Sequence, residues 1–209
     1  KKREGAVTAI GAVSPPGGDT SEPVSQATLR IVKVFWGLSA TLAYRRHFPA
    51  IDWLKSYSLY EDVLHQDINQ NYHKDWSKII RRVQILLQEE ASLQEIVRLV
   101  GLDSLSKADR IKLLVSQMIR EDFLHQNAYN SVDTYTSINK QYLMLITILR
   151  WYDLGNQALE KGKAFSEIER MKTTERIGRL KYVREEDVHE ETNSIQQAME
   201  KEFSSLGEE

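Results

Sequence analysis

The chain has 209 residues, of which 41% are hydrophobic, enough to bury a packed core. Its 28 basic and 30 acidic side chains leave a net charge of -2, which gives no global field to attract nucleic acid or an anionic bilayer. The absence of cysteine excludes disulfides and thiolate zinc sites and suits a reducing compartment such as the cytoplasm, and every apolar run is far shorter than the ~20 residues of a membrane span.

The first 58 residues have the composition of an α/β segment. Residues 6–13 are small and partly β-branched, and residues 29–36 are rich in Ile, Val, Phe and Trp, so we expect a strand at each, the second one buried on both faces of a parallel sheet. Between them lies a turn cluster, Ser14-Pro15-Pro16-Gly17-Gly18-Asp19. Because only one short apolar segment precedes this turn, we expect the rest of the sheet to lie outside this sequence.

A short helix is expected next, over residues 40–47, with Ser39 as its N-cap. Proline disfavours the helical conformation in the residue before it, so the helix should stop where His47 and Phe48 lead into Pro49. Phe48 is therefore expected in a turn.

From about residue 60 onward the apolar residues recur with the 3.6-residue period of amphipathic helices. Helices are expected over residues 61–71 and 75–90. Ser92 and Glu95 have capping-box spacing, which predicts a new segment that Gly101 terminates. Ser106 is expected to cap a third helix, and residues 137–161 to form a fourth. The simplest architecture for these pieces is a helical bundle.

The last segment, residues 185–209, is acidic. Its apolar positions are sparse, at Val188, Ile195, Met199 and Phe203. We expect a marginal surface helix there. The chain then divides into an α/β segment over 1–58, a helical bundle over 59–184 and an acidic helix or tail over 185–209, and its fold class is mainly α.

Motifs for phosphate binding, nucleophilic catalysis and metal binding are absent from the sequence, which contains no G-x-x-x-x-G-K-[ST], G-x-S-x-G or H-E-x-x-H. Gly17 and Gly18 precede Asp19, whose charge would repel a phosphate, so we interpret this turn as a structural edge of a pocket rather than an anion cradle. Glu121 and His125 could share a helix face. With one histidine and no third ligand nearby they indicate an exposed charged face, and no metal site is predicted.

Aromatic residues offer a further pattern. Phe48 at the turn, and Phe123 with Tyr129 around the break that follows the third helix, could form two walls of a flat apolar slot. Aromatic stacking on a nucleobase is worth roughly 1–3 kcal/mol per contact. Spacing alone leaves two interpretations open, core packing and base stacking.

Several strings of this sequence resemble the catalytic A subunit of V-type and A-type rotary ATPases. In the first 58 residues the matching strings are Gly11-Ala12-Val13-Ser14-Pro15-Pro16-Gly17-Gly18-Asp19, Ser21-Glu22-Pro23-Val24, Leu29 to Leu38, and Arg45-Arg46-His47-Phe48-Pro49-Ala50-Ile51. In the helical part they are Asp122-Phe123-Leu124, Gln126-Asn127-Ala128, Val132-Asp133-Thr134-Tyr135 and Lys140-Gln141-Tyr142-Leu143-Met144. The resemblance covers nearly the whole chain and thins in the acidic tail.

This resemblance implies a fold and a function. The chain would be roughly the last third of a catalytic subunit, a C-terminal helical bundle preceded by the last strands and helix of a RecA-like α/β nucleotide-binding domain. The implied activity is ATP hydrolysis or synthesis coupled to proton or sodium transport across a membrane. Because the phosphate loop, catalytic glutamate and magnesium-binding residues of this family lie upstream, no catalytic residue is expected here, and the isolated chain is expected not to hydrolyse ATP.

The resemblance also implies a ligand for the aromatic slot, ATP or ADP carried with Mg. Phe48, the aromatic residue before proline, would stack on the adenine ring, and a second wall would come from the segment that contains Phe123, Gln126, Ala128 and Tyr129. The implied partners are B subunits in an alternating hexameric ring and the subunits of a central stalk. These partners would place the chain in the cytoplasm, peripheral on a membrane through the complex.

Three positions depart from the pattern of the family. Thr20 stands where a bulky residue is frequent, Ser39 where Asp is usual, and Tyr129 where Phe is common. Ser39 can cap a helix as Asp does, and Tyr129 keeps the π face of a phenyl ring.

Composition alone favours a different class of function, a non-enzymatic helical module that binds partner proteins through the bundle or the acidic tail. This alternative assigns no role to a nucleotide.

Overall fold

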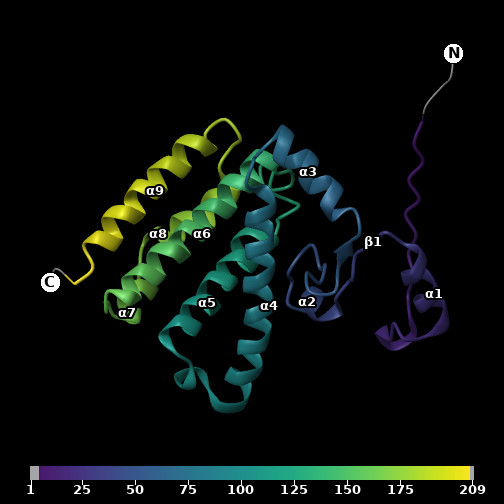
Figure 1. The fold of residues 1–209 in the computed structure, drawn as a ribbon, viewed down its shortest axis with the longest axis horizontal. Coiled ribbons are helices and arrows are strands. Elements are labelled where there is room, and N and C mark those ends of the chain that lie inside the picture. Colours follow the sequence, from purple (N-terminus) through teal and green to yellow (C-terminus); the bar gives the residue numbers. More distant parts are fainter. Residues whose placement is uncertain (1–4, 208–209) are drawn as a thin grey trace.

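The computed structural model describes residues 5–207 and is mainly helical, as predicted (Figure 1). Four long helices lie side by side: α4 (Trp76–Val100), α5 (Lys107–Met118), α6 (Ile138–Glu160) and α9 (Val188–Ser204). Shorter helices complete the bundle: α3 (Glu61–Asn71), α7 (Phe165–Glu169) and α8 (Thr173–Arg179). A π-helix (Ile119–Leu124) continues α5, and 3-10 turns occupy Pro16–Gly18, Leu102–Ser104 and Leu180–Tyr182.

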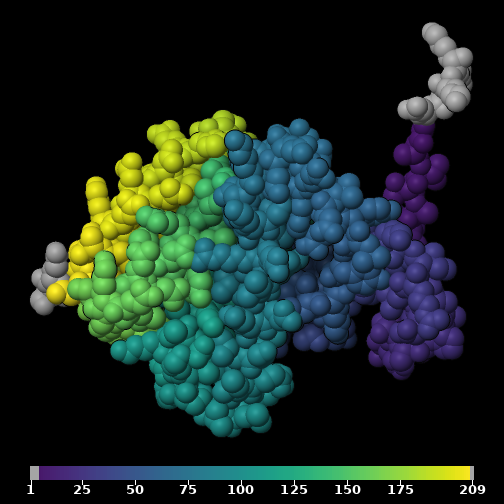
Figure 2. Space-filling model, in the orientation of Figure 1, coloured from purple at the N-terminus to yellow at the C-terminus, as the bar shows by residue number. Residues whose placement is uncertain are grey.

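The first part of the chain packs less tightly. It contains α1 (Pro23–Ile31), β1 (Val34–Phe35), α2 (Ala40–Tyr44) and β2 (Tyr57–Ser58), and the two strands pair antiparallel. Residues 5–13 have no regular structure and project from the body of the molecule, as the purple segment of Figure 2 shows. The N-terminal part with α1, β1 and α2 lies on the opposite side of the molecule from α9.

The strands expected over residues 6–13 and 29–36 are largely wrong for this structure. Val7 and Ile10 are almost fully exposed, and within residues 5–207 no segment pairs with them. Residues 29–31 form the last turn of α1 and not a strand. The helix starts upstream, where Glu22 accepts hydrogen bonds from the N–H groups of Val24 and Ser25 and Pro23 occupies the first helical position. This local start signal outweighs the β-branched composition, and only Val34–Phe35 remains as a strand.

The predicted cap of α2 is confirmed. The hydroxyl of Ser39 accepts a hydrogen bond from the N–H of Leu42 at 3.3 Å. The helix ends at Tyr44, three residues before the predicted end, because Arg46 adopts a left-handed backbone conformation with φ of 59°. Phe48 then lies in a bend, as predicted.

Helix α4 passes through Ser92 without a break, so the expected new helix at this residue is wrong. Residues 76–100 contain neither glycine nor proline, and the backbone hydrogen bonds continue across Ser92. The predicted end at Gly101 is confirmed, since this residue has φ of 87°, a conformation that favours glycine.

Serine N-caps set the starts of α5 and α6. The cap at Ser106 was predicted, whereas for α6 only a start near residue 137 was predicted. Ser106 accepts a hydrogen bond from the N–H of Asp109, and Ser137 accepts one from the N–H of Lys140, both at 3.1 Å. Helix α3 has the predicted bounds. Local sequence signals therefore suffice for these boundaries.

Helix α6 is the centre of the core and packs on α5 at one side and on α9 at the other. Its buried residues point in several directions and include Leu143, Met144, Leu145, Ile148, Leu149, Trp151 and Ala158. Because α6 has apolar residues around most of its circumference, it needs cover on more than one face.

That cover explains why the expected marginal surface helix at the end of the chain is wrong. In α9, Val188, Ile195 and Met199 are all 0% exposed and Phe203 is 8% exposed. These residues lie on one face of the helix, which packs on α6 and α8, while Glu190 and Glu200 are exposed to solvent. The acidic composition describes only the outer face of α9.

Two buried lysines connect α6, the segment at residues 181–183 and the end of the π-helix through hydrogen bonds. Lys140, 0% exposed, donates hydrogen bonds from Nζ to the carbonyl oxygens of Lys181 at 2.9 Å and Val183 at 2.6 Å. Lys181 in turn donates from Nζ to the carbonyl oxygens of Glu121 at 2.8 Å and His125 at 3.1 Å. The ammonium group of Lys181 thus donates hydrogen bonds to carbonyl groups at the end of the π-helix, where donors from the helix itself are lacking.

Asp122 lies beside this connection. Burial raises the pKa of its carboxyl group to about 6, and the positive charge of Lys181 opposes the rise. Its carboxylate also lies close to Gly178 in α8, where an added Cβ would be 3.0 Å from Oδ1. The lack of a side chain at Gly178 therefore lets α8 approach the π-helix.

A second glycine sets the distance between α5 and α6. Gly155 lies in the interior of α6, and a Cβ built there would overlap Cδ1 of Ile111, which is 0% exposed in α5. Glycine costs an α-helix about 1 kcal/mol relative to alanine. Close helix packing is the physical reason for keeping it here.

We predict that Gly155→Ala lowers the free energy of unfolding by about 1–2 kcal/mol, because overpacking costs about 1–3 kcal/mol and outweighs the gain in helix propensity. Ile111→Val removes Cδ1 and should relieve the overlap. Urea unfolding of both single variants and the double variant measures the coupling. Strictly additive losses would contradict this account of the contact.

Candidate functional site

Two segments far apart in the sequence meet at the end of the π-helix. The N–H of Gln126 donates a hydrogen bond to the carbonyl oxygen of Phe48 at 2.7 Å. Nε2 of His47 lies 3.0 Å from the carbonyl oxygen of Arg120. Because a carbonyl oxygen only accepts hydrogen bonds, Nε2 carries the proton. The turn at residues 47–49 is therefore held against residues 120–126 by one backbone hydrogen bond and one side-chain hydrogen bond.

His47 is the anchor of this turn. It is 6% exposed, and its ring lies 5.5 Å from that of Trp53 and 5.2 Å from that of His125. Its Nδ1 is buried and has no hydrogen-bond partner among the described residues. Burial lowers the pKa of His125, and the charges of Lys181 and His47 lower it further. The neutral form of His125 is thus favoured beside the turn.

The predicted slot residues divide into an exposed set and a half-buried set. Phe48 is 50% exposed, Tyr129 is fully exposed, and Ala128 is exposed as well. Gln126 and Phe123 are half-buried, and Phe123 packs against the hydrophobic core. The structure thus brings the turn with Phe48 next to the start of the loop with Gln126, and Phe123 packs beneath that loop.

The loop is shaped by three side chains that sequence reasoning missed. Asp133 accepts a hydrogen bond from the N–H of Asn127, whose own side chain accepts one from the N–H of Tyr129. Asn130 accepts from the N–H groups of Val132 and Asp133. The spacing of Asn127, Asn130 and Asp133 could have predicted this loop from the sequence. Short amide and carboxylate side chains commonly form hydrogen bonds with nearby backbone groups in turns.

A cavity of about 190 Å³ lies under this loop. Its lining residues come from the π-helix, the loop and the start of α6: Phe123, Leu124, Gln126, Asp133, Thr136, Gln141 and Met144. Two of the predicted slot residues are among them, so the cavity belongs to the same region.

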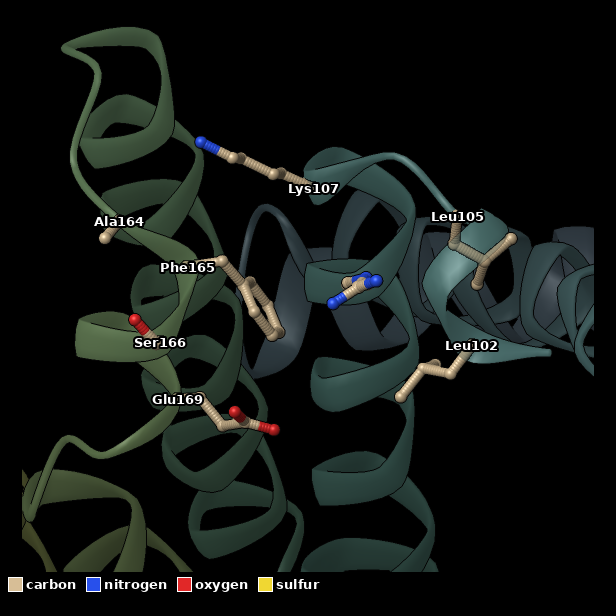
Figure 3. A pocket seen from close by; sticks show the side chains of 8 residues that line it. Leu102, Leu105, Lys107, Ala164, Phe165, Ser166 and Glu169 are labelled. Atoms are coloured by element: carbon tan, nitrogen blue, oxygen red, sulfur yellow. The ribbon is translucent and has the colours of Figure 1, made fainter.

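A second cavity, of about 460 Å³, opens at the other end of α5 (Figure 3). Figure 3 shows Phe165 on one wall, with Leu102 and Leu105 on the opposite wall. Lys107 and Glu169 lie at its rim. It contains none of the predicted site residues.

The Gly/Pro turn adopts the backbone conformation that its glycines permit. Gly17 has φ of 65° and Gly18 φ of 75°, and the side chain of Asp19 accepts a hydrogen bond from the N–H of Ser21 at 2.9 Å. Across residues 5–207 no three acidic or histidine side chains come together as a metal site would require. In the same range no helix is long and apolar enough to cross a membrane.

Comparison with known proteins identifies two adjoining regions. Residues 1–58 match the nucleotide-binding domain of the ATP synthase alpha/beta family, and residues 65–168 match the C-terminal domain of V and A type ATP synthase. The contact between the turn at 47–49 and the segment at 120–126 therefore joins the two matched regions.

Individual relatives agree with these matches. The V-type ATP synthase alpha chain of Acetivibrio thermocellus is 56% identical over 98% of this chain and 35% of its own length. That of Thermoanaerobacter pseudethanolicus is 62% identical over 88% of this chain and 31% of its own length. A solved structure, ATP synthase subunit NeqB from Nanoarcheaum equitans, is similar with a TM-score of 0.54 and 28% identity, covering 66% of this chain and 32% of that one.

The chain thus spans about a third of the length of the curated relatives that it matches. Both family models and the named relatives point to one group of proteins. The chain belongs to the V- and A-type ATP synthase alpha-chain family and corresponds to the C-terminal portion of its members.

Proposed function

We propose that this chain is the C-terminal part of the catalytic alpha chain of a rotary ATPase, which couples ATP hydrolysis or synthesis to proton or sodium transport, and that it supplies the adenine side of the nucleotide site. The observation that carries this proposal is the hydrogen bond from the N–H of Gln126 to the carbonyl oxygen of Phe48. It joins the two segments whose side chains would enclose the base.

The chemistry of these side chains suits an adenine ring. Phe48 and Tyr129 offer exposed π faces, and stacking on a base contributes about 1–3 kcal/mol per contact. Gln126 carries both donor and acceptor groups that can pair with the edge of a base. Ala128 is small enough to leave room for a flat ligand, and Phe123 supports the loop from the core side.

Phosphoryl transfer itself is mostly positioning and electrostatic stabilisation by groups around the phosphates and their Mg²⁺ ion. We assign those groups to the part of the alpha chain upstream of this segment. No catalytic residue is assigned within the segment, and its helices would pass movements of the nucleotide site to the central stalk.

Membership of the family supports a proposed assembly. B subunits would alternate with alpha chains in a hexameric ring, the bundle would face the central stalk, and contact with the membrane would be indirect. We propose a domain boundary near residue 58 and group α9 with the bundle, because its apolar face packs on α6.

The chain by itself is predicted to lack ATPase activity, because the groups that bind the phosphates are assigned elsewhere. Phosphate release from Mg-ATP by the purified 209-residue chain measures this directly. Turnover that disappears when a residue within the chain is changed would overturn the assignment, whereas turnover unaffected by any such change would indicate a contaminating ATPase.

Phe48→Ala in the full-length alpha chain that contains this segment should weaken ATP binding by about 1–3 kcal/mol, the value of one stacking contact. Isothermal titration of the assembled complex with ATP gives this difference. Tyr44→Ala is the matched control, because Tyr44 is an aromatic residue of α2 that is 88% exposed and lies outside the proposed site.

Equal ATP affinity for wild type, Phe48→Ala and Tyr44→Ala would reject the stacking role.

A further inference from the structure

Asp133, one of the three side chains that shape the loop, is a buried carboxylate. It is 2% exposed and lies in the loop between the π-helix and α6, at the wall of the 190 Å³ cavity. Burying a carboxylate is costly unless strong hydrogen bonds compensate. Its position in a loop, where a neutral residue would cost less, calls for a specific partner.

That partner is the backbone of the loop. Oδ2 of Asp133 accepts a hydrogen bond from the N–H of Asn127 at 2.6 Å, the short distance of a charge-assisted bond. The preceding N–H, that of Gln126, is bonded to the carbonyl oxygen of Phe48. Two consecutive amide groups are therefore held by different parts of the protein, which fixes the orientation of the peptide between them.

The constraint extends to Tyr129. The side chain of Asn127 accepts a hydrogen bond from the N–H of Tyr129 at 3.0 Å, and the N–H of Asn130 donates to the carbonyl oxygen of Asn127 at 3.1 Å. The side chain of Asn130 accepts a hydrogen bond from the N–H of Asp133 at 3.1 Å. The series of hydrogen bonds therefore begins and ends at Asp133. A change at Asp133 would therefore be felt along the whole loop.

Among the described residues, no charged side chain forms a hydrogen bond or an ion pair with Asp133. Burial lowers the pKa of Lys140, and the carboxylates of Glu185 and Asp133 oppose that shift. Lys140 itself donates its hydrogen bonds to the carbonyl oxygens of Lys181 and Val183. The direct contact of Asp133 is thus with the Asn127 amide, and its function follows from that contact.

We propose that Asp133 is a positioning residue for the nucleotide base: its carboxylate holds the loop at residues 126–129 in the conformation that contacts adenine. This inference rests on the proposed function, and it adds a residue that touches neither the base nor the phosphates. A positioning role of this kind affects the base end of ATP and leaves the phosphate end unchanged.

The test uses the full-length alpha chain that contains this segment, assembled in its complex. Asp133→Ala, which removes the acceptor, should weaken ATP binding about tenfold, the cost of one charge-assisted hydrogen bond. Asp133→Asn keeps an acceptor oxygen and should stay within about threefold of wild type. Binding of Mg-tripolyphosphate, which has no base, should be the same in all three proteins.

Asp62→Ala is the matched control, because Asp62 is an exposed aspartate of α3. Hydrogen exchange of the wild-type protein without nucleotide is a test that needs no variant. The Asn127 amide should exchange slowly, because it is hydrogen-bonded to Asp133. Fast exchange of this amide would overturn the inference even if Asp133→Ala does not fold.

Other outcomes separate the inference from the function on which it rests. Wild-type ATP affinity in Asp133→Ala, alongside weakened binding in Phe48→Ala, would overturn the positioning role and leave the stacking role intact. Equal losses of ATP and tripolyphosphate, or an Asp133→Asn variant as weak as Asp133→Ala, would also overturn it. No loss in either Phe48→Ala or Asp133→Ala would reject the proposed adenine site itself.

Discussion

The carbonyl groups at the end of the π-helix need hydrogen-bond donors, and the chain supplies them from two distant segments. His47 reaches the carbonyl oxygen of Arg120 from the N-terminal side, and Lys181 reaches those of Glu121 and His125 from the C-terminal side. Helix ends leave carbonyl groups without intrahelical partners, and burying them unpaired is costly. The Arg120 carbonyl oxygen also accepts the N–H of His125 at 2.8 Å, so His47 is its second donor. Satisfying this one helix end brings three parts of the chain together.

The bundle gives this meeting point a rigid base. Helix α6 packs on α5 and α9, and the loop with the proposed adenine contacts lies between the π-helix and α6. Binding residues on a loop are placed accurately when the elements on both sides are fixed. Among the described residues of the region matched to the nucleotide-binding domain, the turn at residues 47–49 is the part assigned to the proposed site.

Sequence reasoning succeeded where the signal was local. Ser39 and Ser106 were predicted as caps because a hydroxyl near a helix start needs no distant partner. It failed at Ser92, where the same local pattern occurs inside a continuous helix, and at residues 29–31, where Glu22 and Pro23 start a helix in an apolar segment. The burial of α9 depends on the shape of α6, which composition does not reveal.

The candidate site shows the same division. Spacing suggested a slot of Phe48, Phe123 and Tyr129, and the family resemblance added Gln126, Ala128 and the adenine ligand. The hydrogen bond from the N–H of Gln126 to the carbonyl oxygen of Phe48 was not deducible from spacing. His47, Asp133 and Lys181 were missed, because their partners are backbone groups whose position exists only in the folded chain. Residues that act through backbone contacts leave little trace in a single sequence.

The central claim is that the turn at residues 47–49 and the loop at residues 126–129 enclose one adenine ring. Photolabelling of the assembled complex with an ATP derivative that carries an azide on the base, followed by peptide mapping, tests it most directly. The account predicts label on Tyr129 or on its loop and on the turn that contains Phe48, with competition by unmodified ATP. Label confined to residues outside both segments would contradict it.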